Sequence, residues 1–269
     1  MDLSRDPAHD ELPDLTPLLD SDSAQEALTG VLEEFRDSDG PLSIGALSDE
    51  ELFACLASEA HVQPQGEWFS GLTSAQRRTA RTAALRSLTT RGEVMVGSDE
   101  DGDVGARMSL RLMALLRLRR DPILLSARGM TRQGPSWYLL RRHGDVWMRE
   151  IVSEHGYHSH DLVRLDDTEE VFFRMFAALG DQQHPSRVSL RHEGGVPMSM
   201  AVRAFLADQR HVTQLAIVHP GQDDPESFVI CVDHDEAMTI GVPQGEALVY
   251  SGGAASAVLE RWRAWREQW

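Results

Sequence analysis

Residues 123–165 decide the fold; they read ILLSARGMTRQGPSWYLLRRHGDVWMREIVSEHGYHSHDLVRL. Short runs of apolar, aromatic and β-branched residues alternate here with polar segments that contain glycine. The turns around Gly144 and Gly156 are so short that the strands on either side of them must be antiparallel. We therefore predict a four-stranded meander. Its strands are expected at residues 123–127, 136–142, 146–152 and 158–165.

Upstream, residues 72–96 (LTSAQRRTARTAALRSLTTRGEVMV) carry the start and stop signals of a helix. Thr73 and Gln76 have the spacing of a capping box, and Gly92 has the position of a left-handed C-cap before a strand at 93–96. A second capping box, Ser48 with Glu51, indicates another helix start. Apolar periodicity places the helices of this region at 23–37, 49–60, 73–91 and 106–120.

Downstream, much of the same order of elements returns. Helices are expected at 168–179, 197–209 and 254–267, with a polar connector at 181–195. Strands are expected at 212–219, 227–233, 236–242 and 247–250. The order of helices, then strands, then a helix thus occurs twice. It predicts an α+β fold in which helices flank a central antiparallel β-sheet, with two quasi-symmetric halves. We expect an acidic flexible tail at 1–22, a first α+β half at 23–180 and a second at 181–269.

The composition excludes several classes of protein. All 26 basic residues are arginine, so no lysine-dependent enzyme is possible, and the formal net charge of −17 disfavours nonspecific phosphate binding. The two cysteines, Cys55 and Cys231, lie in apolar segments typical of buried thiols rather than of disulfides or zinc ligands. With no apolar run long enough to span a membrane and no signal peptide at the start, we expect a cytoplasmic protein.

Two histidine segments are the main candidates for chemistry. His158 and His160 would share one face of a strand, as metal-ligating imidazoles can, but a third ligand could only be guessed among His155, Asp161 and Asp233. We favour an exposed polar strand face there. Residues 233–236 (DHDE) are better explained by a β-turn than by a catalytic dyad. We therefore expect no enzyme activity and assign no catalytic, cofactor-binding or metal-ligating residue.

An arginine-rich helix followed by glycine and a strand is also typical of winged-helix DNA-binding proteins. In this alternative, residues 49–96 form a transcriptional regulator whose Arg77, Arg78, Arg81 and Arg86 meet DNA. The net charge and the long sequence that follows favour a solvated helix face instead.

Aromatic residues at the end of the chain offer a different kind of surface. Trp262, Trp265 and Trp269 recur at helical spacing, which indicates either a core stripe or an apolar seam for a partner helix. We take Trp262 and Trp265 as candidate partner-binding residues.

Three segments carry a family resemblance: residues 72–92, 112–125 (LMALLRLRRDPILL) and 246–260 (EALVYSGGAASAVLE). They resemble an early helix, the next helix with its following strand, and the last strand with the final helix of the EspG proteins, the cytosolic chaperones of actinobacterial type VII (ESX) secretion. The acidic extension of nearly fifty residues before them departs from that pattern.

The resemblance implies a non-catalytic chaperone that binds the helical tip of a PE–PPE type client. It also implies that a loop between early sheet strands engages the client. The matching stretch here is 128–135, with Met130 and Arg132 as contact residues. From this we expect an amphipathic, helical protein partner, no membrane partner and no cofactor, with nucleic acid retained as the alternative partner.

Overall fold

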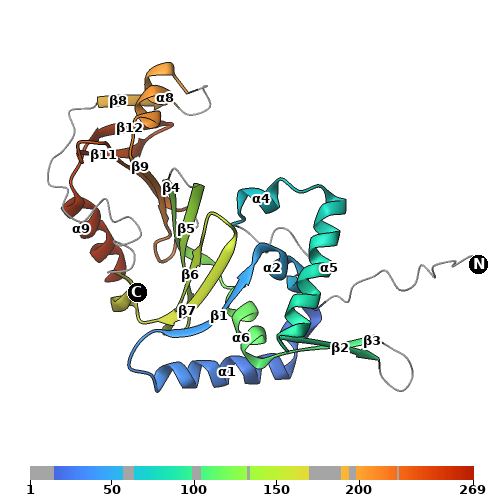
Figure 1. Ribbon diagram of the computed structural model, residues 1–269. Helices are drawn as coiled ribbons and strands as arrows, with labels where there is room; N and C mark the ends of the chain where they lie inside the picture. Colours follow the sequence, from blue (N-terminus) through green and yellow to red (C-terminus); the bar gives the residue numbers. More distant parts are fainter. Residues whose placement is uncertain are drawn as a thin grey trace, which may run out of the picture.

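A continuous antiparallel β-sheet forms the centre of the molecule (Figure 1). The computed structural model describes residues 15–56, 64–98, 104–131, 134–169, 189–193, 198–222 and 224–269. The strands are β1 Leu42–Ser48, β2 Val94–Ser98, β3 Val104–Met108, β4 Ile123–Thr131, β5 Gly134–His143, β6 Val146–Val152, β7 Tyr157–Val163, β8 Ser189–Glu193, β9 His211–Ile217, β10 Glu226–Val232, β11 Met238–Gln244 and β12 Ala247–Gly252. The helices are α1 Asp22–Arg36, α2 Asp49–Leu56, α4 Glu67–Ser70, α5 Ser74–Thr90, α6 Leu110–Leu118, α8 Met200–Ala207 and α9 Ala255–Arg266, with 3-10 turns η2 Thr16–Asp20 and η3 Leu165–Asp167.

The ten-stranded sheet consists of two halves with the same connections. Its strand order is β1-β7-β6-β5-β4-β9-β10-β11-β12-β8. One meander runs outward from β4 to β7 and the other from β9 to β12, and each is closed at its outer edge by an earlier strand, β1 or β8. The halves meet where β4 pairs with β9. The predicted α+β class with two quasi-symmetric halves is therefore confirmed, while the boundary between the halves at residue 180 stays a prediction.

One face of the sheet, which we call the closed face, is buried across both halves. Leu125 and Leu140 of the first half and Leu215 and Ile230 of the second contribute to a single apolar cluster. Helix α9 covers this cluster through Trp262 and its neighbours (Figure 1). Burying such a continuous apolar surface is the main stabilising contribution of the fold.

The opposite face, which we call the open face, is covered by the described residues towards its two ends. At the β1 end, α1, α2 and α6 pack on residues such as Met148 and Leu162. At the β8 end, Val202 of α8 packs on Cys231 and Tyr250. The strand register carries this face without interruption from β6 through β5, β4 and β9 to β10.

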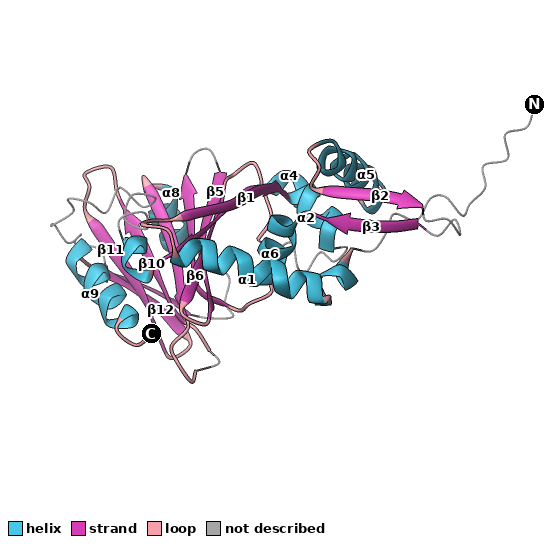
Figure 2. Ribbon diagram, turned by 90° about the horizontal axis from the view of Figure 1, so that it is seen from below, coloured by secondary structure: helices cyan, strands magenta, loops and turns pink. Residues whose placement is uncertain are grey.

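The first half also contains an insertion. Between β1 and α6 the chain forms α2, α4, α5 and a separate ribbon of β2 with β3, whereas β8 and α8 are joined by residues 194–199 alone. Figure 2 shows the ribbon projecting away from the large sheet. Both predicted capping boxes are present: Thr73 with Gln76 at α5, and Ser48 with Glu51 at α2. Gly92 has the expected positive φ of 75°.

The structure corrects several predicted elements. Residues 106–108 belong to β3 rather than to the start of a helix, because they pair with β2 and the helix begins only after Ser109, whose side chain accepts from the Leu112 N–H. The edge strands β1 and β8 were missed. At β1 the cause is Gly45, whose φ of 144° interrupts a strand-like pattern with a bulge.

The predicted tail also ends earlier than residue 22. Leu15 and Leu19 are buried in the core between the helices, and Arg117 donates to the Leu19 carbonyl at 2.8 Å. Apolar spacing around the proline of η2 therefore outweighs the local acid. The predicted helix at 168–179 lies outside the described residues from position 170 on.

Candidate functional site

The middle of the open face is the largest part of the sheet that no described helix covers. Along β4, Leu125 and Ala127 are buried on the closed face, whereas Arg128 is exposed on the open one. Along β9, Leu215 is buried and Gln214 is exposed in the same way. This alternation is typical of an antiparallel sheet with one face in the core and the other available. We call the region of β5, β4, β9 and β10 that no described helix covers the open strip. Its side chains are Ser126, Arg128, Met130, Trp137, Gln214, Ala216 and Ser227, and it is bordered by Val212 and Val229, which pack against the α8 cluster.

Arg128 and Trp137 form the most distinctive pair in the open strip. The Arg128 guanidinium lies 5.5 Å from the centre of the Trp137 ring, within the range of a cation–π contact. Among the described residues Arg128 has no carboxylate partner. Beside this pair, Met130 is 39% exposed. Tryptophan and arginine are the residue types that most often dominate protein interfaces.

The predicted partner-binding residues have different outcomes. Met130 lies in the open strip, near the end of β4 rather than in a loop, because β4 continues to Thr131 and β5 begins at Gly134. Arg132 lies outside the described residues. Arg128 and Trp137 were missed as site residues because the segment 128–135 was taken as a loop, although Ser126, Arg128 and Met130 already show the alternation of a strand.

The two tryptophans belong to the core instead of a partner surface. Trp262 and Trp265 are each about 1% exposed. The Trp265 ring meets Trp147 of β6 at 5.6 Å, and its Nε1 donates to the Val218 carbonyl at 2.8 Å. The predicted seam is therefore not available to a partner, because α9 uses these side chains to close its own sheet.

A second notable site lies beneath the helices at the β1 end of the open face. Six side chains meet there in what we call the ionic cluster, with Glu150 at the centre: Asp49 of α2, Arg119 at the end of α6, Arg141 of β5, Glu150 of β6, and His158 and His160 of β7. Glu150 Oε1 accepts from Arg119 Nε at 3.1 Å and lies 2.7 Å from His158 Nδ1, and its Oε2 accepts from Arg141 at 3.3 Å. The other His158 nitrogen, Nε2, lies 2.9 Å from Asp49 Oδ1.

Charge and burial determine the protonation of this ionic cluster. Burial by itself would raise the pKa of Glu150, but Arg119 and the histidine contacts outweigh it and hold the pKa well below its usual range. Burial likewise opposes a charge on His158, yet its contacts with Asp49 and Glu150 raise the pKa. For His160, burial prevails and lowers the pKa. The exposed polar strand face predicted for His158 and His160 is wrong, since both side chains are fully buried.

The cluster does not suit a metal ion, although Glu150, His158 and His160 place one donor atom each within 4.8 Å of one another. Both Glu150 oxygens already accept from guanidinium groups, and both His158 nitrogens already face carboxylates. A divalent cation would add its charge beside Arg119 and Arg141 in a buried site. The carboxylates and imidazoles of the cluster are therefore better explained as hydrogen-bonding one another through protons than as ligands of a metal ion.

The remaining candidates are structural. Asp233 Oδ1 accepts from the backbone N–H groups of Asp235 and Ala237, which confirms the turn. Burial raises the pKa of each cysteine thiol to about 12, so neither is a reactive thiolate.

The arrangement of α5 differs from that of a winged helix. The strand before α2 pairs with β7 in the large sheet instead of joining β2 and β3, and residues 57–73 separate α2 from α5 where a helix-turn-helix has a turn of about three or four residues. Arg77 donates to the Ser70 carbonyl and stacks on Phe69, so it is engaged within the chain.

Comparison with known proteins gives one kind of match. No family model matches the chain, and no curated protein matches it by sequence. Among solved structures, the chain is similar to the Mycobacterium tuberculosis type VII secretion system chaperone EspG5 in complex with the PE25–PPE41 dimer. The match covers 83% of this chain and 96% of that chain, with 9% sequence identity and a TM-score of 0.44. The described helices include none that combines the length and apolarity of a membrane span.

Proposed function

We propose that this chain is a non-catalytic cytoplasmic chaperone that holds a helical, amphipathic protein client on the open strip. The proposal is supported by the centre of the sheet, which no described helix covers and where Arg128 stacks on Trp137 beside the exposed Met130. A half-open antiparallel sheet gains stability when an apolar helix face packs on it. Helices at both ends of the open face would flank such a client.

The chemistry of the rest of the molecule supports binding over catalysis. The acid and base groups of the ionic cluster are buried, and they pair with one another, so a substrate has no access to Glu150 or His158. The open strip itself offers one charged group among its described side chains and no general base. The sequence resemblance suggests that the client is a secretion substrate of the PE–PPE type.

The proposal is tested by co-expressing the chain with an amphipathic helical secretion substrate of the PE–PPE type and measuring the Kd of the complex. We expect the substitutions Arg128→Glu and Met130→Asp each to weaken binding by about tenfold or more. Arg78→Glu on α5 and Met95→Asp on β2 are matched controls, because they make the same changes at exposed positions outside the open strip. Equal losses for the controls, or no loss at Arg128 and Met130, would reject the open strip as the client site.

A further inference from the structure

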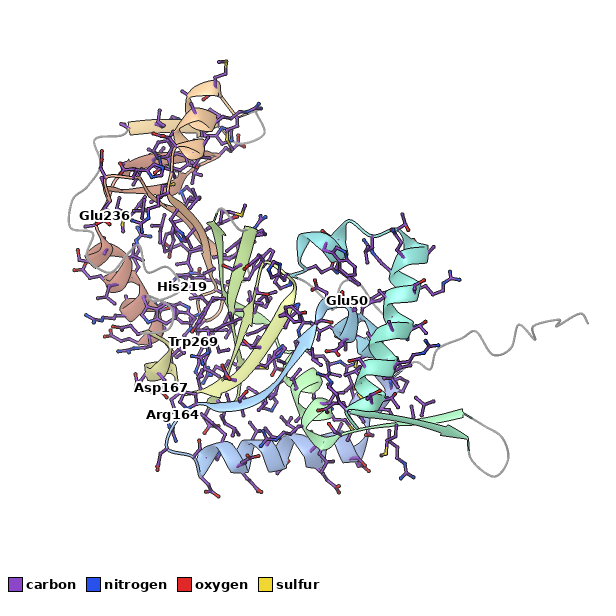
Figure 3. All side chains as sticks on the ribbon, in the orientation of Figure 1. Glu50, Arg164, Asp167, His219, Glu236 and Trp269 are labelled. Carbon is purple, nitrogen blue, oxygen red and sulfur yellow. The ribbon has the colours of Figure 1, made fainter. Side chains whose placement is uncertain are left out.

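Asp49 joins three segments that are distant in sequence. It begins α2, where Figure 3 labels the next residue, Glu50. Its Oδ2 accepts from the Gly66 N–H at 2.9 Å, and its backbone N–H donates to the Gly156 carbonyl at 2.9 Å. The start of α2, the chain just before α4 and the turn between β6 and β7 are thus held together around one buried carboxylate.

His158 completes this junction from the sheet. Its Nε2 faces Asp49 Oδ1 at 2.9 Å and its Nδ1 faces Glu150 Oε1 at 2.7 Å. A carboxylate only accepts, so both contacts are hydrogen bonds only while both ring nitrogens carry a proton. The raised pKa of His158 agrees with this doubly protonated form.

The charged groups around His158 indicate which of its two bonds is lost on deprotonation. Asp49 comes from α2, Glu150 from β6, Arg141 from β5 and Arg119 from the end of α6; His160 is its neighbour on β7, and β1 places the uncharged Leu47 opposite it. Glu150 keeps two guanidinium partners whatever the state of His158. Among the described residues, Asp49 has only His158 as a cationic partner. Nδ1 is therefore the nitrogen that gives up its proton, and the neutral ring keeps its Nε2–H toward Asp49.

We propose that His158 is a proton-operated latch that closes residues 64–70, including α4, over the turn between β6 and β7. While His158 is doubly protonated, its positive charge balances the negative charge of the Asp49 carboxylate. Residues 64–70 then stay docked through the hydrogen bond from the Gly66 N–H to Asp49. Once His158 loses its Nδ1 proton and becomes neutral, the Asp49 carboxylate is buried without a counter-charge, and the segment lifts to let water reach it. The latch does not depend on the proposed client.

Hydrogen exchange of the full chain, read by mass spectrometry and corrected for intrinsic exchange rates, tests this proposal. Between pH about 6 and pH about 9, protection of residues 64–72 should fall by about tenfold or more, while protection of β9 and β10 changes little. In Asp49→Asn the buried charge is gone, so protection of the segment should no longer depend on pH. In His158→Gln it should be low and independent of pH.

Three further measurements distinguish the latch from titration elsewhere in the turn and from metal binding. His155→Gln, in the same turn but exposed, should keep the pH dependence of the wild type. Chelator should have no effect on protection. The 15N shifts of His158 should report two protonated ring nitrogens at neutral pH, which needs no variant to fold. The proposal is overturned if protection of the wild type is independent of pH, if Asp49→Asn keeps the dependence, if His155→Gln removes it, if chelator changes protection or if His158 has one protonated nitrogen.

Discussion

Gly156 is the residue at which the turn between β6 and β7 depends most directly on the lack of a side chain. It has a positive φ of 73°, and a Cβ atom there would lie 2.0 Å from Asp49 Oδ2. Gly144 has a similar φ of 62°, with nothing within 4 Å of an added Cβ. The two glycines therefore separate the effect of backbone conformation from the effect of packing around Asp49.

We expect Gly144→Ala to lower the free energy of unfolding by about 1 kcal/mol, the cost of a left-handed alanine. Gly156→Ala should lower it by at least about 1 kcal/mol more, because the methyl group also displaces the Asp49 carboxylate. Urea denaturation of both variants measures the difference. Equal losses would mean that the turn does not pack closely on Asp49.

Sequence periodicity predicts which face of a strand a side chain occupies, but it does not predict which other element covers that face. His158 and His160 do share a face, as their spacing requires, but their burial comes from α2 and α6, which lie far away in the sequence. The sequence around Asp49 and Glu150 does not indicate that they pair with a histidine, because their shared partner, His158, lies 109 and 8 residues away along the chain. The cysteines were predictable because their neighbours along the chain are themselves apolar.

At the scale of elements, α9 is held to the closed face by its tryptophans, while Trp68 of α4 is 58% exposed. Trp265 packs against Trp147 and Trp269, the latter labelled in Figure 3 at the end of the chain. Trp265→Ala should lower the free energy of unfolding by roughly 3–5 kcal/mol, because it leaves a cavity and an unpaired Val218 carbonyl.

Trp68→Ala is the matched control and should change the unfolding free energy by less than about 1 kcal/mol. Chemical denaturation followed by circular dichroism measures both variants. A small effect of Trp265→Ala would contradict the assignment of α9 to the core.

Elements with clear boundary signals were predictable, and those defined by distant pairing were not. Capping boxes placed α2 and α5, and short turns placed the two meanders. Residues 106–108 were predicted to be helical because they precede the apolar pattern of α6 without a break, and only pairing with β2 makes them a strand. The end of β4 could not be predicted for the same reason, because its extension to Thr131 depends on pairing with β5 and β9.

At the scale of the molecule, the two halves share their connections but differ in what surrounds them. The insertion of α2, α4, α5 and the ribbon is present in the first half alone, so the open strip lies between unlike neighbours. The element order of the halves was readable from the sequence. That β4 pairs with β9 to make one sheet, whose centre no described helix covers, follows only from the three-dimensional arrangement.

Whether a client binds the open strip is tested most directly by site-specific photo-crosslinking in the cells that produce the protein. A benzophenone amino acid is placed at Gln214 of β9 or at Glu260 of α9. Both positions are exposed, but only Gln214 lies in the open strip. We predict that Gln214 crosslinks to one helical protein client and that Glu260 does not. A client captured equally at both positions, or only at Glu260, would show that the open strip is not the client site.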